Sequence, residues 1–177
     1  MIRKADEGDV HALCGMERAA SGTALAHVFA GIAFPYGDVQ ARWQLVLDDP
    51  SAEVIVDELD GQLVGYAAYG DGWLRHFGVV PEHWGSGRAQ ALYAAVLERA
   101  TAAGSPTSHL WVLVDNHRAH AFYRRLGWHD TDVREQETFP PYPLKTQLNR
   151  PLSGDQRSIA ADLSLSEQRH VSVRGAV

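Results

Sequence analysis

The fold of this chain is decided by residues 79–128, which read VVPEHWGSGRAQALYAAVLERATAAGSPTSHLWVLVDNHRAHAFYRRLGW. The hydrophobic pattern predicts a strand, a glycine-rich turn, a helix, a second strand and a second helix. The first strand begins before this segment and covers residues 73–80. The turn covers 84–89, the first helix 88–103, the second strand 109–114 and the second helix 116–126. A strand, helix and strand in this order form a βαβ unit, so the two strands should be parallel neighbours. The segment therefore predicts an α/β fold.

The turn at residues 84–89 has the features of an anion site. Gly85 and Gly87 carry no Cβ, so the backbone can adopt positive φ and come close to a ligand. The N–H groups that begin the next helix lack partners within it, and the helix dipole adds positive charge there. This combination suits a phosphate or a pyrophosphate.

Two common nucleotide-binding motifs do not fit this turn. A dinucleotide-binding motif needs a third glycine where this chain has Gln90. A P-loop needs Gly-Lys-Ser/Thr after its first glycine, and the sequence lacks that string. A tight turn without a ligand remains open when the glycines are considered alone.

The second helix carries one apolar stripe, formed by Ala119, Phe122, Tyr123 and Leu126 at positions i, i+3, i+4 and i+7. Asn116, or Asp115 before it, can cap the start of the helix. On this pattern alone, a tyrosine in the stripe is a core residue. However, the helix should begin beside the helix whose N-terminus forms the anion site.

Together, the two segments resemble the GCN5-related N-acetyltransferase (GNAT) superfamily. The cofactor motif of that family is Arg/Gln-x-x-Gly-x-Gly/Ala, and here it reads Trp84-Gly85-Ser86-Gly87-Arg88-Ala89. The second family motif is Asn-x-x-Ala-x-x-Phe-Tyr-x-x-x-Gly-Phe/Trp, which fits residues 116–128 throughout. Trp84 departs from the Arg/Gln of the family, which removes one polar contact to a pyrophosphate.

The resemblance implies an α/β fold with a mixed central sheet and flanking helices, spanning residues 1–152. Residues 153–177 have few apolar side chains and no sustained period, so we expect a flexible tail there. The alternation of apolar and polar residues, together with turn signals such as Asp60-Gly61, predicts further strands. The remaining predicted strands are 2–4, 53–59, 62–69, 128–138 and 144–152, and the remaining predicted helices are 7–20 and 38–48, the latter capped by Asp38.

The resemblance also implies acetyl-CoA as the acyl donor and no metal. N–H groups around Gly78 and Val79 would hold the acetyl carbonyl, with Gly78 permitting a β-bulge. The pyrophosphate would lie on the turn, and the pantetheine arm would contact the second helix. The residues implied in cofactor binding are Phe77, Gly78, Val79, Trp84, Gly85, Ser86, Gly87, Arg88, Ala89, Asn116, Ala119 and Phe122.

Tyr123 matches the general acid of the family. A thiol has a pKa of about 8.5 and a tyrosine about 10, so a tyrosine beside the leaving thiolate stays protonated and can donate. The general base is open between His76, which has a suitable intrinsic pKa, and deprotonation through water. Strand alternation turns His76 away from the site unless a bulge intervenes.

Three further residues are candidates for the acceptor site. Arg75 can bind an acceptor carboxylate or can be a solvated strand residue. Phe34 and Tyr36 lie in a predicted loop, as does Tyr142, and these aromatic rings can line the acceptor pocket. Trp111 and Trp128 are expected in the core.

Composition and charge argue against nucleic-acid and membrane partners. The 177 residues carry a net charge of −6, which argues against nucleic acid as a partner and is compatible with a cationic amine. The charged N-terminus and the absence of a transmembrane-length apolar run argue against a membrane partner. The single cysteine, Cys14, cannot form a disulfide framework, so we expect a cytoplasmic protein. Cys14 itself is expected to be a buried apolar residue. We expect a monomer or a homodimer.

The sequence leaves the acceptor open. A small-molecule primary amine is the first expectation, and a protein or peptide amine is the alternative. A domain that binds acyl-CoA as a sensor without turnover is a third possibility, although Tyr123 and the unbroken glycine turn favour an enzyme.

Overall fold

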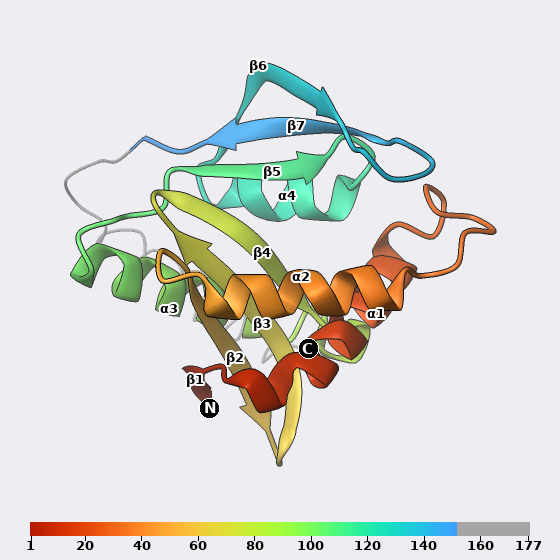
Figure 1. Ribbon diagram of the computed structural model, residues 1–177. Coiled ribbons are helices and arrows are strands. Elements are labelled where there is room, and N and C mark those ends of the chain that lie inside the picture. The colour runs from red at the N-terminus through yellow and green to blue at the C-terminus, as the bar shows by residue number, and fades with distance from the viewer. Residues whose placement is uncertain (152–177) are drawn as a thin grey trace, which may run out of the picture.

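The computed structural model describes residues 1–151, which form a seven-stranded mixed sheet flanked by helices (Figure 1). The strand order is β1-β2-β3-β4-β5-β7-β6, and only β4 and β5 are parallel. The strands are β1 (Ile2–Lys4), β2 (Glu53–Leu59), β3 (Gln62–Gly70), β4 (Trp73–Val79), β5 (His109–Leu113), β6 (His129–Gln136) and β7 (Leu144–Asn149). The helices are α1 (Val10–Ala24), α2 (Tyr36–Asp48), α3 (Arg88–Ala102) and α4 (His117–Arg125), with short 3-10 turns at Glu7–Asp9 and Pro81–His83. The predicted fold class is confirmed.

The N-terminal helices differ from their prediction. A 3-10 turn capped by Asp6 replaces the expected first turn, and α1 then continues to Ala24 rather than ending at residue 20. Asp38 does not cap α2, because this helix begins two residues earlier and Asp38 lies in its first turn. The longer α1 matters for function, since its last turns reach the cleft described below.

The hairpin between β2 and β3 follows its turn signal. Asp60 and Gly61 both have positive φ, 51° and 78°, as a two-residue hairpin turn of matching twist requires. The antiparallel pairing continues from β3 to β4 but contains one irregularity. Ala68 pairs with His76 and Tyr69 pairs with Leu74, so Arg75 is the extra residue of a β-bulge.

Strands β4 and β5 pair for a short distance and then separate. The paired residues are Trp73 with His109 and Leu74 with Leu110. Beyond them, the β5-facing edge of β4 has no neighbouring strand among the described residues. Figure 1 shows β5, β7 and β6 at the top, apart from the β1–β4 half of the sheet. The sheet therefore opens between its two halves.

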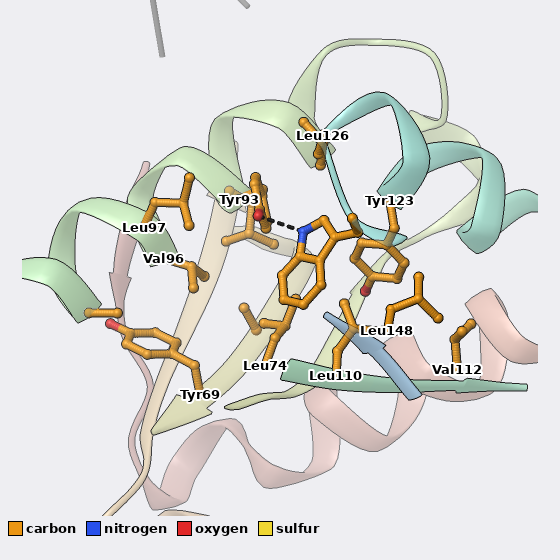
Figure 2. Close-up of a cluster of buried hydrophobic side chains, with 14 of the residues drawn as sticks. Tyr69, Leu74, Tyr93, Val96, Leu97, Leu110, Val112, Tyr123, Leu126 and Leu148 are labelled. Atoms are coloured by element: carbon orange, nitrogen blue, oxygen red, sulfur yellow. Dashed lines mark hydrogen bonds between the residues drawn. The ribbon is translucent and has the colours of Figure 1, made fainter. Parts of the chain in front are cut away.

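Two hydrophobic clusters cover the two faces of the sheet. One lies between β3, β4 and β5 and the helices α3 and α4, and it includes Tyr93, Tyr123 and Trp128. The other packs α1 and α2 on β2 and β3, and it includes Cys14, which is fully buried as expected. In the first cluster the Trp128 indole donates a 2.7 Å hydrogen bond to the Tyr93 hydroxyl (Figure 2).

The predicted tail, residues 153–177, lies outside the described residues. The strand predicted for residues 144–152 is shorter than expected, because β7 ends at Asn149. Within residues 1–151, every helix is too short or too polar to span a bilayer.

Candidate active site

A cleft of about 710 Å³ opens where β4 and β5 separate. It is lined by the end of β4, the glycine turn (residues 84–89), the start of α4 and one side of α1. Most of the predicted cofactor residues therefore meet at one place: Phe77, Gly78, Val79, Trp84, Gly85, Gly87, Ala89, Asn116, Ala119 and Phe122 all line it, and so does Tyr123.

The glycine turn has the backbone that its sequence predicts. Gly85 and Gly87 have φ of 76° and 84°, in the left-handed region that favours glycine. Gly87 is the N-cap residue of α3 and supplies no side chain to cap it. No side chain of residues 1–151 caps α3, and Ala89 and Gln90 of its first turn line the cleft, so the first N–H groups of the helix are available to an anion there.

Two side chains of the turn are directed elsewhere. The Arg88 guanidinium donates to Asp57 on β2 at 2.7 Å, and the Ser86 hydroxyl donates to the carbonyl of His83 at 2.6 Å. Neither residue lines the cleft. The predicted role of these two residues toward a cofactor is thereby limited to their backbone.

Trp84 supports the turn from inside. Its indole N–H donates to the carbonyl of Val79 at 2.7 Å, which ties the turn to the end of β4. The guanidinium of Arg118, on α4, lies 3.9 Å from the centre of the Trp84 ring and lines the cleft. Arg118 was not predicted as a site residue, although it stands beside the predicted Ala119. Because the Arg118 guanidinium stacks on the Trp84 ring, it places a cation near the turn, where the family motif has Arg or Gln.

The start of α4 is built as the sequence predicts. The Asn116 side-chain oxygen accepts a 3.1 Å hydrogen bond from the N–H of Ala119, so Asn116 is the N-cap. This bond uses the side-chain oxygen, and the amide NH₂ of Asn116, which lines the cleft, has no hydrogen-bond partner among residues 1–151. Phe122 stacks on Phe77 of β4, with ring centres 5.5 Å apart.

Tyr123 extends from α4 into the first hydrophobic cluster, next to Leu110 and Leu148 in Figure 2. The residue is 7% exposed, lines the cleft, and its hydroxyl has no hydrogen-bond partner among residues 1–151. Burial raises the pKa of Tyr123 above its usual value, and nearby Tyr93 adds to the effect. The hydroxyl is therefore protonated at neutral pH and free to donate.

Gly78 makes room for a side chain rather than for a bulge. A Cβ at this position would lie 2.5 Å from the hydroxyl oxygen of Tyr66, which faces it from β3. The prediction that Gly78 permits a β-bulge is wrong, because the bulge lies at Arg75. Gly78 is needed because the Tyr66 ring covers the backbone there.

The bulge decides the orientation of His76. With Arg75 as the extra residue, His76 faces the α1 and α2 side of the sheet, where its ring lies 5.0 Å from that of Trp43. It lines the cleft, but burial lowers its pKa to about 3, and Arg42 and Arg75 contribute. A histidine with that pKa is a weak base at neutral pH. The structure therefore does not favour His76 as the general base.

The structure does not support the prediction that Arg75 binds an acceptor carboxylate. The Arg75 guanidinium already binds Asp49, at 2.5 Å, and Ser51, at 2.9 Å, so it is not available for an acceptor carboxylate. Hydrogen bonds from Ser51 and Arg75 lower the pKa of Asp49 to about 2, which keeps this pair ionised.

The aromatic residues expected at the acceptor pocket lie outside it. Phe34 and Tyr36 do not line the cleft: they pack against the second hydrophobic cluster, and the Tyr36 hydroxyl pairs with Nδ1 of His11 at 2.7 Å. Tyr142 is 52% exposed and also lies outside the cleft. Trp111, which was expected in the core, instead lines the cleft and is half-buried, while Trp128 is buried as expected.

The lowered pKa of half-buried His76 should make the stability of the fold depend on pH. Its pKa is about 3 when folded and about 6.5 when unfolded, so the unfolded chain binds the additional proton between these values. The contribution of uncharged His76 to the free energy of unfolding is complete above pH 6.5 and is lost as the pH falls toward 3. We expect the free energy of unfolding to drop by about 2 kcal/mol from this residue between pH 7 and pH 5.

Urea unfolding at both pH values measures this effect. The variant His76→Gln should lose most of the pH dependence, whereas His129→Gln, at an exposed position, should keep it. Equal pH dependence in His76→Gln and the parent protein would show that other groups bind the proton.

Comparison with known protein families identifies the family of this chain. A model of the acetyltransferase (GNAT) family matches residues 24–128, more than half of the chain. The chain belongs to the GNAT family. The matched residues contain β4, the glycine turn, α3, β5 and α4, which line most of the cleft, whereas α1 lies outside the match except for Ala24.

Relatives of this GNAT chain act on different acceptors, according to their names. A mycothiol acetyltransferase of Streptomyces avermitilis is 37% identical over 102 residues, which are 49% of this chain and 33% of that protein. A putative ribosomal protein bS18-alanine N-acetyltransferase of Bacillus subtilis is 27% identical over 94 residues, 51% of this chain and 62% of the relative. The chain thus spans only a third of the first relative.

Solved structures support the GNAT fold. A GCN5-related N-acetyltransferase of Rhodopseudomonas palustris superposes with a TM-score of 0.69 at 19% identity, covering 86% of this chain and 95% of that one. A ribosomal-protein-alanine N-acetyltransferase of Brucella melitensis gives 0.64 at 22% identity, covering 86% and 99%. Among residues 1–151, no group of three or more His, Cys, Asp or Glu side chains is arranged to hold a metal ion.

Proposed function

We propose that the protein is an N-acetyltransferase that transfers the acetyl group of acetyl-CoA to a primary amine by direct attack. The observation that carries the proposal is the position of Tyr123. Tyr123, whose protonated hydroxyl has no partner in residues 1–151, lines the same cleft as the N-terminus of α3, which no side chain of these residues caps, and the open edge of β4. A proton donor, an anion site and free backbone groups are what acetyl transfer from a thioester needs.

The residues present fit acetyl-CoA. The first-turn N–H groups of α3 and the Arg118 guanidinium would hold the pyrophosphate. The NH₂ of Asn116 and the unpaired edge of β4 beyond Leu74 would bind the amides of the pantetheine arm, and Ala119 leaves space for it. When bound, acetyl-CoA supplies the activated acetyl thioester.

Two groups of the chain would then act on the reaction. Backbone N–H groups near Gly78 and Val79 would donate to the acetyl oxygen, where negative charge develops as the amine attacks. The Tyr123 hydroxyl would give its proton to the sulfur as the carbon–sulfur bond breaks. Since His76 is a weak base, proton removal from the amine is assigned to water in the cleft.

We propose a small-molecule amine as the acceptor. The relative from S. avermitilis carries the name of an enzyme for a small molecule, whereas the B. subtilis relative is named for a protein alanine. A protein N-terminus is therefore the second candidate. A sensor without turnover is disfavoured, because such a protein does not need an unpartnered, protonated Tyr123.

Calorimetry and a thiol-release assay test the proposal. We expect acetyl-CoA to bind, and free thiol to appear only when both acetyl-CoA and an accepted amine are present. Small amines and peptides with free N-termini should be compared, with mass spectrometry to identify the acetylated product. Binding of acetyl-CoA without acetylation of any amine or peptide would favour the sensor.

The role of Arg118 gives a separate prediction. We expect Arg118→Gln to weaken acetyl-CoA binding by about 10-fold, since it removes a charged contact near the pyrophosphate. Arg124→Gln removes a charge from the same helix at a 62% exposed side chain that pairs with Asp130, and it should have little effect. Calorimetry at two salt concentrations measures both variants, and equal affinities would exclude Arg118 from the site.

A further inference from the structure

One side of α1 forms part of the cleft and has no role in the proposed chemistry so far. Its residues there are Glu17, Ala20, Ser21 and Ala24, at positions i, i+3, i+4 and i+7, so they share one face of the helix. Three of the four are small and leave space beside them. Glu17 is the one charged side chain on this face.

The carboxylate of Glu17 is held in place from one side. Its Oε2 atom accepts hydrogen bonds from Nη2 of Arg42 and from the Trp43 indole, the latter at 2.9 Å. The side chain is 18% exposed. The other oxygen, Oε1, has no hydrogen-bond partner within residues 1–151, although a carboxylate can accept about four hydrogen bonds. One anionic oxygen of a fixed carboxylate is thus open at the cleft.

The cleft is polarised between its two ends. On the α3 and α4 side of the sheet it is lined by Arg118 and Arg125, beside the glycine turn. On the α1 side, the lining side chains near Glu17 are Tyr66 and His76, both uncharged at neutral pH, and Arg75, whose guanidinium is bound to Asp49. Arg42 does not line the cleft. Glu17 and Arg42 form an ion pair through Oε2, and the open Oε1 atom of Glu17 is what this pair presents to the cleft as a charged hydrogen-bond acceptor.

We propose that Glu17 is an acceptor-binding residue that selects cationic amines by a charge-assisted hydrogen bond to its Oε1 atom. This inference rests on the proposed function, because acetyl-CoA would occupy the α3 and α4 side and leave the α1 side to the acceptor. A cationic group on that side would meet an oriented carboxylate, and a carboxylate on the acceptor would be repelled by it. The acceptor class is therefore an amine without a neighbouring carboxylate.

Steady-state kinetics with Glu17→Gln tests the proposal. The amide keeps the shape and the oxygen that Arg42 and Trp43 contact, but it removes the charge. With butylamine and putrescine as acceptors, we expect KM for the amine to rise by about 10- to 100-fold, with a smaller change in kcat. KM of the parent protein should also rise with salt, and that dependence should be lost in the variant.

A matched control and a second substrate complete the test. Glu98→Gln removes the same charge from an exposed position on α3 and should leave KM for the amine unchanged. Glycine, which carries a carboxylate, should be a poor acceptor for the parent protein and should gain relative to butylamine in Glu17→Gln. Acetyl-CoA affinity should be the same in all three proteins.

The outcomes separate this inference from the proposed function. If the parent protein acetylates amines and Glu17→Gln has the same KM and the same preference against glycine, Glu17 does not select the acceptor, while the acetyltransferase function stands. If no amine is acetylated, titration of butylamine into the protein saturated with CoA takes the place of kinetics, and weaker binding to Glu17→Gln supports the proposal. Absence of any amine binding by the parent protein would overturn both.

Discussion

Replacing Tyr123 by Phe is expected to lower kcat for acetyl transfer by about 10²- to 10⁴-fold, while acetyl-CoA binds almost as tightly as before. The ring is 7% exposed and packs between Trp128 and Phe122, so Phe keeps these contacts and deletes the hydroxyl alone. Because the hydroxyl has no partner among the described residues, its removal leaves none of their polar groups unsatisfied. Stopped-flow or steady-state thiol release measures the rate, and calorimetry measures the affinity.

Two controls make this result specific to proton donation. Tyr93→Phe removes a buried hydroxyl from the same cluster but outside the cleft, so it should cost stability rather than rate, because it leaves the Trp128 indole without its acceptor. A lower-pKa leaving thiol should also restore part of the rate of Tyr123→Phe, since such a thiolate needs less protonation. A kcat near that of the parent protein would mean that solvent or another residue protonates the sulfur.

The second large effect is expected at the glycine turn. Gly87→Glu should weaken acetyl-CoA binding by about 100-fold or more, because it combines two penalties. The residue has φ of 84°, which costs a side chain of the L series about 1–2 kcal/mol. Its carboxylate would also stand at the N-terminus of α3, where a pyrophosphate would bring negative charge of its own.

Gly87→Ala separates the two penalties. It has the same backbone strain without the charge, so it should lose less affinity than Gly87→Glu and should share its loss of thermal stability. High salt should recover part of the binding in Gly87→Glu and little in Gly87→Ala. Unchanged affinity in Gly87→Glu would exclude this turn as the pyrophosphate site.

Local patterns predicted most of the fold. Residues 79–128 contained the turn glycines, the cap at Asn116 and the apolar stripe of α4, and each of these depends on neighbours within a few positions. The Asp60-Gly61 hairpin was predictable for the same reason. The boundaries of α1 and α2 were less accurate, because Asp38 resembles a cap by residue type while the helix begins earlier, where Tyr36 packs on His11.

The acceptor side of the site depended on contacts between distant residues and could not be predicted. Arg75 resembled a free binding residue, but its partner Asp49 lies 26 positions away. His76 had a suitable intrinsic pKa, but the bulge at Arg75 turns its ring toward Trp43, and partial burial there lowers its pKa. Glu17 could not be identified from local sequence, because Arg42 and Trp43 on another helix hold its carboxylate in place.

The separation of β4 from β5 also determines how the molecule holds together mechanically. Strand pairing between β4 and β5 is limited to two residues on each strand, so side-chain packing under the helices also joins the two halves of the sheet. This packing includes the bond between Tyr93 of α3 and Trp128. Tyr123 belongs to that same set of side chains. A repacking that slides one half past the other would therefore also shift Tyr123, the proposed proton donor, relative to β4. At this position rigidity and the proposed catalytic alignment depend on one group of aromatic rings.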